Sequence, residues 1–340
     1  MDTKNGKKAL VTGGTGFLGR NLVKYLLDRG WNVVCLVRPN SRHGVLTEMG
    51  AELVLGDFTQ EEILKKAVEN VDVVFHVAGC VAALTLEKVM QVNCQYSENL
   101  VRVCAEKENP PIFVYVSSLA AAGPSTPERP HEEDDPCKPI SWYGKSKFAA
   151  EMMLRGYAER LPITVVRPPM LFGPYDHEVV KWFQGIRKSG IFFIPFIRNY
   201  RFSMAHVDDV CQLLVLASEK GDRMVKEPET QGQAVYYVSQ TEHPTYMEMG
   251  KIFGTALGRK RTFILPVSPI VMRIVCGVSE FWAQRTGKVT TLGMDKYREV
   301  SAGSWSCSAD KARKQLGFQN QGTLQEQCNT TAKWILEHEK

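Results

Sequence analysis

Short apolar runs rich in β-branched residues alternate with amphipathic stretches through the first half of the chain. The runs typical of buried strands are Lys8–Thr12, Trp31–Val37, Glu52–Leu55, Val71–Val77, Ile112–Ser117 and Ile163–Arg167. Between the first two, apolar residues recur at helical spacing from Leu18 to Leu27, and Gly30 stands where a helix should end. Thr59 and Glu62 form a capping-box pattern ahead of a further helix. Strands that alternate with helices predict an α/β fold of βαβ units around a parallel sheet.

The second half of the chain is less regular. After about residue 168, a proline-rich aromatic stretch leads to the apolar segment Ile191–Ile197. Val207–Leu216 predicts a helix, Ala234–Val238 a strand and Leu324–Leu336 a final helix. A second apolar stripe follows helical spacing, with polar residues and a glycine on the opposite side: Val271, Ile274, Val275, Val278, Phe281 and Trp282. Both apolar segments are interpreted as core packing, and the alternative is a lipophilic pocket in contact with a membrane surface.

Composition and charge exclude several classes of protein. The 340 residues are 44% hydrophobic and 23% charged, so the chain can bury a sizeable core and is not disordered. The net charge of +5 is dispersed, which argues against a nucleic-acid partner. Nine cysteines without a C-x-x-C pair predict free thiols in a reducing compartment and no zinc site. The acidic stretch His131–Cys137 is interpreted as a solvent-facing loop rather than a metal site.

No segment predicts secretion or membrane insertion. The apolar stretch Ala9–Val11 is too short for a signal peptide. The longest apolar run, Ile270–Val278, is interrupted by Arg273 and falls short of the roughly 20 residues that a spanning helix needs. The sequence therefore predicts a soluble, cytoplasmic protein without a transmembrane segment.

A glycine-rich turn follows the first strand and opens the first helix. Gly13, Gly16 and Gly19 permit a tight turn, close approach of backbone N–H groups to a pyrophosphate, and close packing of the helix on the sheet. Because a strand precedes the turn and a helix follows it, the pattern predicts a dinucleotide site.

The end of the second strand bears on the choice of cofactor. A site for NAD usually has an acidic side chain there, whereas a basic side chain suits the 2′-phosphate of NADP. Here Arg38 ends the strand, and Ser41 and Arg42 follow it closely. NADP is therefore predicted, and NAD is the alternative if these arginines only belong to a solvated loop. Asp57 and Phe58, after the third strand, are placed to meet the edge of the adenine ring.

Three polar residues form a candidate catalytic group. Tyr143 and Lys147 are four residues apart, hence on one face of a helix. A nearby ammonium lowers the pKa of a tyrosine from about 10, and such a tyrosine exchanges a proton with a substrate oxygen. Ser118 follows the fifth strand, where ligands bind at the carboxyl edge of a parallel sheet, and its hydroxyl can orient a carbonyl.

These segments resemble the extended short-chain dehydrogenase/reductases over essentially the whole chain. The motifs that carry the resemblance are T-G-x-x-G-x-x-G at 12–19, F-H-V-A-G at 75–79, V-N-C at 92–94, S-S at 117–118, Y-x-x-x-K at 143–147, R-P-P-x-x-x-G-P at 167–174 and H-V-D-D-V at 206–210. The resemblance implies a Rossmann doubly wound parallel sheet with a smaller, mixed C-terminal substrate-binding region. It implies a dinucleotide-binding domain over 1–168, to which the chain returns at about 201–240, and a substrate-binding region over 169–200 and 241–340.

The resemblance also assigns site residues. It implies Ser118, Tyr143 and Lys147 as the catalytic group, with Ser118 preferred to Ser117 by its spacing to Tyr143, and Asn93 as a supporting residue. The residues implied for cofactor binding are Gly13, Thr15, Gly16, Phe17, Leu18, Arg38, Ser41, Arg42, Asp57, Phe58, Ala78, Tyr143, Lys147 and Pro168. Homodimers through paired helices are common in the family, so the resemblance allows a homodimer, but no pattern in this sequence indicates one.

Within this family the same catalytic group serves several reactions. Leu119–Ala121 stands where a 4,6-dehydratase has an acidic pair, which argues against that reaction. A nucleotide-sugar epimerase needs cations for a diphosphate, and the candidates are Arg187, Lys188, Arg198 and Arg201. The apolar segments and Arg38 favour the 3β-hydroxysteroid dehydrogenase and dihydroflavonol reductase branches. We therefore predict an NADP-dependent oxidoreductase that interconverts a ketone and a secondary alcohol on an apolar (steroid-, flavonoid- or lipid-like) substrate. The alternative is an NAD-dependent nucleotide-sugar epimerase.

Overall fold

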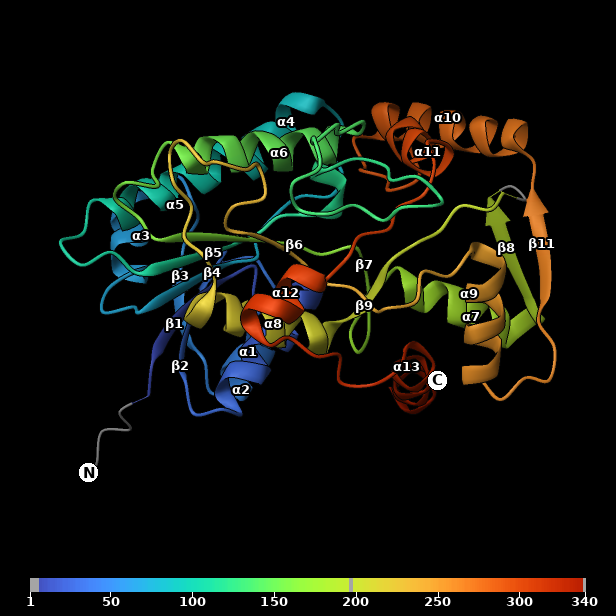
Figure 1. The fold of residues 1–340 in the computed structure, drawn as a ribbon, viewed down its shortest axis with the longest axis horizontal. Coiled ribbons are helices and arrows are strands. Elements are labelled where there is room, and N and C mark those ends of the chain that lie inside the picture. Colours follow the sequence, from blue (N-terminus) through green and yellow to red (C-terminus); the bar gives the residue numbers. More distant parts are fainter. Residues whose placement is uncertain (1–5, 196–197, 339–340) are drawn as a thin grey trace.

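Most of the molecule is organised around one seven-stranded parallel sheet (Figure 1). The structure is a computed structural model, and it describes residues 6–195 and 198–338. In spatial order the strands are β10 (Val235–Tyr237), β6 (Ile163–Arg167), β5 (Ile112–Val116), β4 (Val73–His76), β1 (Lys8–Thr12), β2 (Asn32–Val37) and β3 (Glu52–Leu55). The chain order reverses between β1 and β4, so the carboxyl ends of these neighbours frame a crevice. The predicted α/β fold with a doubly wound parallel sheet is confirmed.

Helices cover both faces of the sheet. Along β1, Ala9 and Val11 pack against one helical layer and Leu10 packs against the other. The first layer consists of α1 (Phe17–Leu27), α2 (Gly44–Glu48), α8 (Val207–Lys220) and α12 (Asp310–Leu316). The second consists of α3 (Glu61–Ala67), α5 (Tyr96–Ala105) and α6 (Trp142–Arg155). The short helix α4 (Leu86–Met90) leads into α5 through a π-helical turn at Gln91–Gln95.

A second core lies on the carboxyl-terminal side of the sheet. Its strands form two parallel pairs, β7 (Met170–Phe172) with β9 (Met204–His206) and β8 (Ile191–Pro195) with β11 (Phe263–Val267). Its helices are α7 (Val179–Ser189), α9 (Tyr246–Ala256) and α13 (Leu324–His338). Phe183 and Phe253 are buried at its centre, with ring centroids 4.6 Å apart. After β11 the chain forms α10 (Pro269–Thr286) and α11 (Met294–Ser301), which return toward α6 (Figure 1).

The capping box predicted at Thr59 and Glu62 is absent. Helix α3 begins at Glu61, and Thr59 Oγ1 donates to Asp57 Oδ1 at 2.5 Å. The Thr59 backbone N–H donates to the same oxygen at 2.8 Å. A turn closed by Asp57 therefore uses the Thr59 hydroxyl before the helix starts.

The acidic stretch at 131–137 was expected to be a solvent-facing loop, but part of it is buried. Glu133 is buried, and its Oε1 accepts from the Tyr237 N–H at 3.0 Å. Asp134 Oδ1 accepts from the Gly232 N–H at 3.0 Å. Because β10 is an edge strand, the outward N–H of Tyr237 needs an acceptor, and the Glu133 carboxylate supplies it. Burial raises the pKa of the Glu133 carboxyl.

The two apolar segments of the second half differ in burial. In the first, Phe192 and Ile194 are buried as predicted and Phe193 is exposed, while Phe196 and Ile197 lie outside the described residues. In the second, the prediction of core packing is wrong, because the stripe lies on the solvent side of α10. Only Cys276 and Ala283 are buried among the 18 residues of this helix. The helix packs against the rest of the protein through the side that carries Cys276 and Ala283, so the apolar stripe on the opposite side is exposed to solvent.

Two further predictions concern the cysteines and membrane-spanning helices. All nine cysteines are free, as predicted. Across residues 6–195 and 198–338, no helix is both long enough and apolar enough to cross a membrane.

Candidate active site

A cavity of about 1300 Å³ opens where the carboxyl ends of the central strands face the second core. The predicted site residues that line it are Gly13, Thr15, Gly16, Phe17, Leu18, Arg38, Ser41, Asp57, Phe58, Ala78, Ser118, Tyr143, Lys147 and Pro168. Arg42 is the predicted cofactor-binding residue that does not line it. The structure therefore brings the predicted catalytic group and nearly all of the predicted cofactor residues into one cavity.

The glycine turn forms a cradle that side chains would fill. Gly13 has φ +70°, and a Cβ built there would lie 2.8 Å from the Ala78 backbone. A Cβ on Gly19 would collide with the Gly13 carbonyl oxygen. The turn is closed by the Gly16 N–H, which donates to the Gly13 carbonyl at 2.9 Å. The three glycines of this tight turn line the cavity at the N-terminus of α1, a position that fits the pyrophosphate of a dinucleotide.

The carboxyl end of β2 presents a cation to the same cavity. Arg38 is exposed and lines the cavity, and Ser41 Oγ donates to the Arg38 carbonyl at 2.7 Å. Hydrogen bonds from Thr59 lower the pKa of Asp57, and the Arg38 charge contributes to this shift. Arg38 and Asp57 therefore share the rim at this end of the cavity.

Tyr143 is held at the start of α6 against the loop that follows β5. Ser141 caps the helix, and its Oγ accepts from the Gly144 N–H at 3.0 Å. A Cβ on Gly144 would collide with the Ala120 carbonyl oxygen, so this glycine permits the close approach of helix and loop. The approach brings the Tyr143 and Ser118 side chains close together. Burial raises the pKa of Tyr143 to about 12, although the neighbouring Ser118 hydroxyl opposes the shift.

Lys147 lies one turn further along α6. Its Nζ donates to the Val116 carbonyl at 2.9 Å and lies 4.8 Å from the centroid of the Tyr115 ring. Burial lowers the pKa of Lys147 to about 8, with Glu151 and Cys80 opposing the shift. The pKa of Tyr143 is therefore shifted in the direction opposite to the one that the sequence predicts, and burial of the phenol is the largest cause.

The two neighbouring serines have different partners. Ser117 is buried, and its Oγ donates to Glu151 Oε1 at 2.5 Å. Glu151 in turn accepts from Arg167 Nη2 at 2.6 Å, inside the sheet–helix interface. Ser118 instead contacts Tyr143 and accepts from the Ala120 N–H at 3.1 Å. The geometry therefore favours Ser118 as the serine available to a ligand.

Asn93 connects the loop after β4 to α6. Its Nδ2 donates to the Cys80 carbonyl at 2.9 Å and to Ser146 Oγ at 2.8 Å, and its Oδ1 accepts from the Cys80 N–H at 2.7 Å. It lies in the π-helical turn, which is the kind of local irregularity that often marks functional sites. Asn93 thus fixes the cavity wall beside Lys147 without lining the cavity itself.

One residue that helps to position the site, Asp295, was not predicted from the sequence. Both carboxylate oxygens of Asp295 accept from the Trp142 N–H at 2.9 Å, so a residue of α11 caps the first turn of α6. Burial raises the pKa of Asp295. Asp295 and Trp142 are 153 positions apart, and no local pattern along the chain signals such a contact.

The part of the cavity beyond Tyr143 is largely apolar. The side chains that line it there include Val81, Leu84, Trp142, Met170, Leu171, Val179, Trp182, Phe192, Phe193, Ile194, Phe202, Met272, Leu292 and Trp305. The two cations from α11 have acidic partners, since Lys296 Nζ lies 2.9 Å from Glu299 and Arg298 Nη1 lies 3.3 Å from Asp295. The four cations considered as diphosphate anchors, Arg187, Lys188, Arg198 and Arg201, do not line the cavity.

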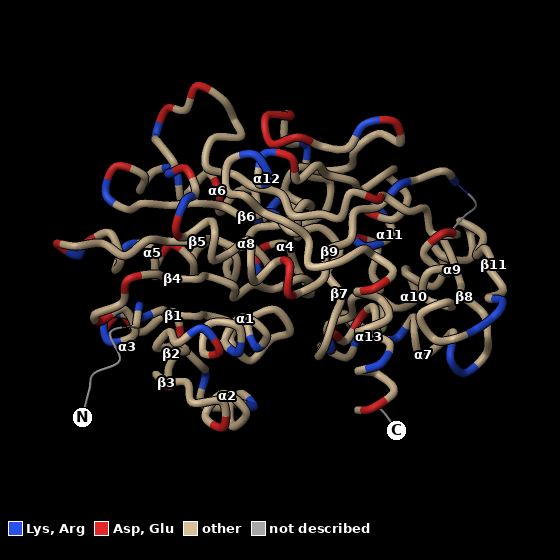
Figure 2. Tube along the Cα trace, turned by 60° about the horizontal axis from the view of Figure 1, so that its bottom comes forward, with Lys and Arg blue, Asp and Glu red and all other residues tan. Residues whose placement is uncertain are grey.

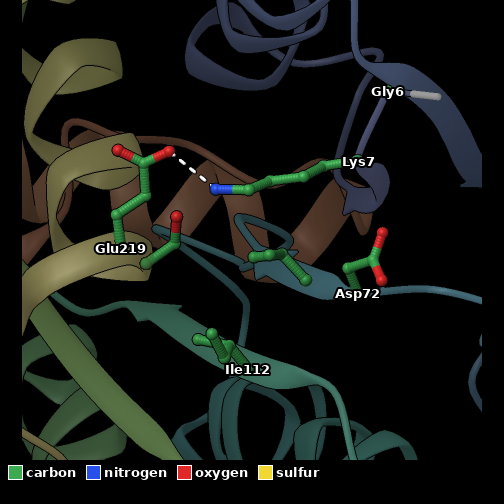
Figure 3. A pocket seen from close by; sticks show the side chains of 7 residues that line it. Gly6, Lys7, Asp72, Ile112 and Glu219 are labelled. Carbon is green, nitrogen blue, oxygen red and sulfur yellow. Dashed lines mark hydrogen bonds and ion pairs between the residues drawn. The ribbon is translucent and has the colours of Figure 1, made fainter. Parts of the chain in front are cut away.

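A smaller pocket of about 440 Å³ opens at the opposite, amino-terminal edge of the sheet (Figure 3). Lys7 Nζ and Glu219 Oε1 form an ion pair across it at 2.8 Å, and Asp72 and Ile112 lie below (Figure 3). Both ion-pair partners are solvent-exposed, which makes the pair weak. This pocket lacks the combination of groups found at the carboxyl edge, so the large cavity is the candidate active site.

Comparison with known proteins agrees with this geometry. The NAD dependent epimerase/dehydratase family matches residues 9–230. The chain belongs to this family. Among relatives in the family, a sterol-4-alpha-carboxylate 3-dehydrogenase (decarboxylating) of Dictyostelium discoideum is 28% identical over 328 residues, which cover 92% of this chain and 96% of the relative. A ceramide reductase of Caulobacter vibrioides is 30% identical over 302 residues, 88% of this chain and 86% of the relative.

A solved structure in the family shows the same fold. The UDP-glucose 4-epimerase of Thermotoga maritima, with UDP-glucose, has a TM-score of 0.78 at 22% identity and covers 98% of this chain and 100% of its own. At that identity the likeness shows the fold alone. The expected membership in the extended short-chain dehydrogenase/reductases is confirmed, and the protein is an NAD(P)-dependent enzyme of the family that acts on CH–OH and C=O groups.

Proposed function

We propose that the protein is an NADP-dependent oxidoreductase that interconverts a ketone and a secondary alcohol on an apolar substrate. The observation that carries the proposal is that Ser118, Tyr143 and Lys147 line one cavity. In the same cavity, the glycine turn lies at one end and the largely apolar lining at the other. The relatives support it, since their names describe a sterol dehydrogenase and a ceramide reductase.

In this proposal, the cofactor when bound would supply the hydride chemistry that turns a ketone into a secondary alcohol. Ser118 orients the carbonyl oxygen by a hydrogen bond. Tyr143, whose pKa of about 12 keeps it protonated at neutral pH, donates the proton that the reduced oxygen takes up. As Tyr143 gives up its proton, the Lys147 ammonium one turn away stabilises the phenolate. Lys147 also has the position to donate to the ribose hydroxyls of the cofactor.

The proposed preference for NADP over NAD rests on the residues that follow β2. Arg38, with Ser41 beside it, offers a guanidinium to a 2′-phosphate at the rim of the cavity. Asp57 and Phe58 border the same end, where the adenine would bind. Arg42, outside the cavity lining, adds only long-range attraction.

An apolar substrate is favoured over a nucleotide sugar by the distribution of charge. A sugar diphosphate needs cations that are free to bind it, but Arg201 Nη1 donates to the His243 carbonyl at 3.0 Å, outside the cavity lining. Lys296 and Arg298 line the cavity and are paired with acids. Lys88, which also lines it, donates to Gln91 Oε1 at 2.7 Å. The aromatic and aliphatic lining instead stabilises a lipophilic ligand.

Titration of NADPH against NADH tests the cofactor assignment, with Arg38→Ala and Arg42→Ala as a matched pair. Loss of a charge-assisted contact should weaken NADPH binding by roughly 10- to 100-fold in Arg38→Ala and leave NADH binding within about twofold. Arg42→Ala should change NADPH binding by less than about threefold, because that side chain is solvated. If wild-type protein binds NADH more tightly than NADPH, or if both variants behave alike, the assignment is wrong.

A further inference from the structure

The outer face of α10 is apolar, which reverses the usual orientation of an amphipathic helix. This outer face consists of the exposed residues Ile270, Val271, Ile274, Val275, Val278, Phe281 and Trp282. Ile274 and Trp282 are 59% and 61% exposed. Cys276 and Ala283, seven residues apart, mark the opposite and buried side. Surface helices normally turn their apolar stripe to the core.

The inward side of α10 fixes this orientation. Met272, Glu280, Ala283 and Gln284 line the large cavity, so the helix forms one of its walls. Glu280 Oε2 accepts from the Met294 N–H at 2.7 Å and ties α10 to the start of α11. Since the polar side is committed to these contacts, the apolar side faces outward.

The segment that carries the outer face is rich in cations, and its one acid lines the cavity instead. The basic residues between positions 257 and 289 are Arg259, Lys260, Arg261, Arg273, Arg285 and Lys288, and the acidic residue is Glu280. The Arg285 guanidinium carbon lies 5.1 Å from the centroid of the Phe281 ring, at the C-terminal end of the helix. A basic segment also lies beside β8 and β11 (Figure 2).

We infer that the outer face of α10 docks on a lipid bilayer that contains anionic headgroups, with the helix lying along the surface. An amphipathic helix with Trp and Phe on its apolar side and cations at its edges binds in this way. A second copy of the chain fits less well, because both halves of a twofold interface would carry the same excess of cations, and the one acid of the segment, Glu280, lines the cavity instead of pairing with them.

Docking would place the cavity directly behind the lipid surface. A lipophilic substrate dissolved in the bilayer would then reach the cavity past α10 without crossing water. This route of entry rests on the proposed function, whereas the docking itself rests on α10 alone.

Co-sedimentation of the full chain with vesicles tests the docking, without cofactor or substrate. The vesicles are phosphatidylcholine alone and phosphatidylcholine mixed with phosphatidylserine. Wild-type protein should bind the mixed vesicles more strongly, and added salt should weaken the binding. Ile274→Glu should lower the partition by at least about tenfold. Arg285→Ala should lower it by roughly fivefold on the mixed vesicles alone.

The matched control is Leu336→Glu, a change on α13 at a residue that is 50% exposed, which should leave vesicle binding unchanged. Thermal unfolding and NADPH binding of each variant show that it is folded. The inference is overturned if wild-type protein ignores mixed vesicles, if Leu336→Glu and Ile274→Glu behave alike, or if Ile274→Glu dissociates a dimer without changing vesicle binding. Absence of ketone reduction by protein that still binds vesicles would refute the proposed function and leave the docking intact.

Discussion

The two helical walls of the cavity, α6 and α10, are built in opposite ways. Helix α6 is packed between the sheet and its neighbours, and Lys147, Glu151 and Leu154 are buried along it. Helix α10 has only small residues buried on its inward side and exposes its large apolar residues. The wall that carries the proposed catalytic residues is thus well packed, whereas the wall formed by α10 exposes apolar side chains to the surroundings. Under the two proposals, chemistry takes place at the first wall and substrate enters past the second.

The largest expected difference between the walls is in turnover. Tyr143→Phe removes the proton donor and should lower kcat by roughly 10²- to 10⁴-fold, with NADPH binding within about twofold of wild type. Trp282→Ala on the outer face of α10 should leave kcat on a water-soluble ketone within about twofold. Steady-state NADPH oxidation measures both. Equal losses in the two variants would remove the distinction between the walls.

The next largest difference between the two helices is expected in how much a substitution lowers the free energy of unfolding. Leu154→Ala opens a cavity in the core beneath α6 and should lower the free energy of unfolding by about 2–5 kcal/mol. Val278→Ala, at a side chain 52% exposed, should change it by less than about 0.5 kcal/mol. Denaturant titration of the two variants gives the values. A loss of several kcal/mol in Val278→Ala would mean that α10 packs against the body of the protein in solution.

The buried Lys147 and the exposed Lys288 should differ in how they change the pH dependence of stability. The Lys147 pKa of about 8 lies below the value of about 10.4 in an unfolded chain, so the unfolded chain binds more protons between these values. The contribution of Lys147 to stability therefore rises as the pH rises through this window. Below about pH 8 the buried charge is destabilising, and Lys147→Met should raise the free energy of unfolding by about 1–3 kcal/mol there.

The control for this prediction is Lys288→Met, which should stay within about 0.5 kcal/mol of wild type at every pH. Unfolding of both variants near pH 7 and near pH 10 provides the measurement. The advantage of Lys147→Met should shrink at the higher pH. A Lys147→Met protein less stable than wild type at about pH 7 would contradict the lowered pKa.

The smallest effect concerns the contact between α6 and α11, the helix that follows α10. Asp295 caps the first turn of α6, and Asp295→Ala should lower the free energy of unfolding by about 1 kcal/mol. Because the capped turn carries Tyr143, kcat should fall several-fold while the KM for NADPH stays close to wild type. Unchanged kcat in a variant with the expected loss of stability would show that the cap is only structural.

The features that sequence predicts well are those that lie close together along the chain. The glycine turn, the pair Tyr143 and Lys147, and Arg38 after β2 each follow from a short pattern beside a strand or helix, and the structure brings them into one cavity. Their roles remain predictions, as do the division into domains near residue 168 and the homodimer that the resemblance allows.

The features that sequence predicts poorly depend on distant partners. Helical spacing shows that Ile274 and Val278 share a face, but the direction of that face depends on contacts such as that of Glu280 with Met294. The burial of Glu133 depends on the free edge of β10. The raised pKa of Tyr143 depends on how deeply the tertiary structure encloses it.

The central claim is net redox chemistry on an apolar ketone in the cavity behind α6 and α10. Its most direct test is nicotinamide absorbance in wild-type protein given NADPH with either a steroid ketone or UDP-glucose. The account predicts one NADPH consumed for each alcohol formed from the steroid ketone and no conversion of UDP-glucose. Conversion of UDP-glucose to its C4 epimer without net change in the nicotinamide, together with no reduction of the ketone, would contradict it.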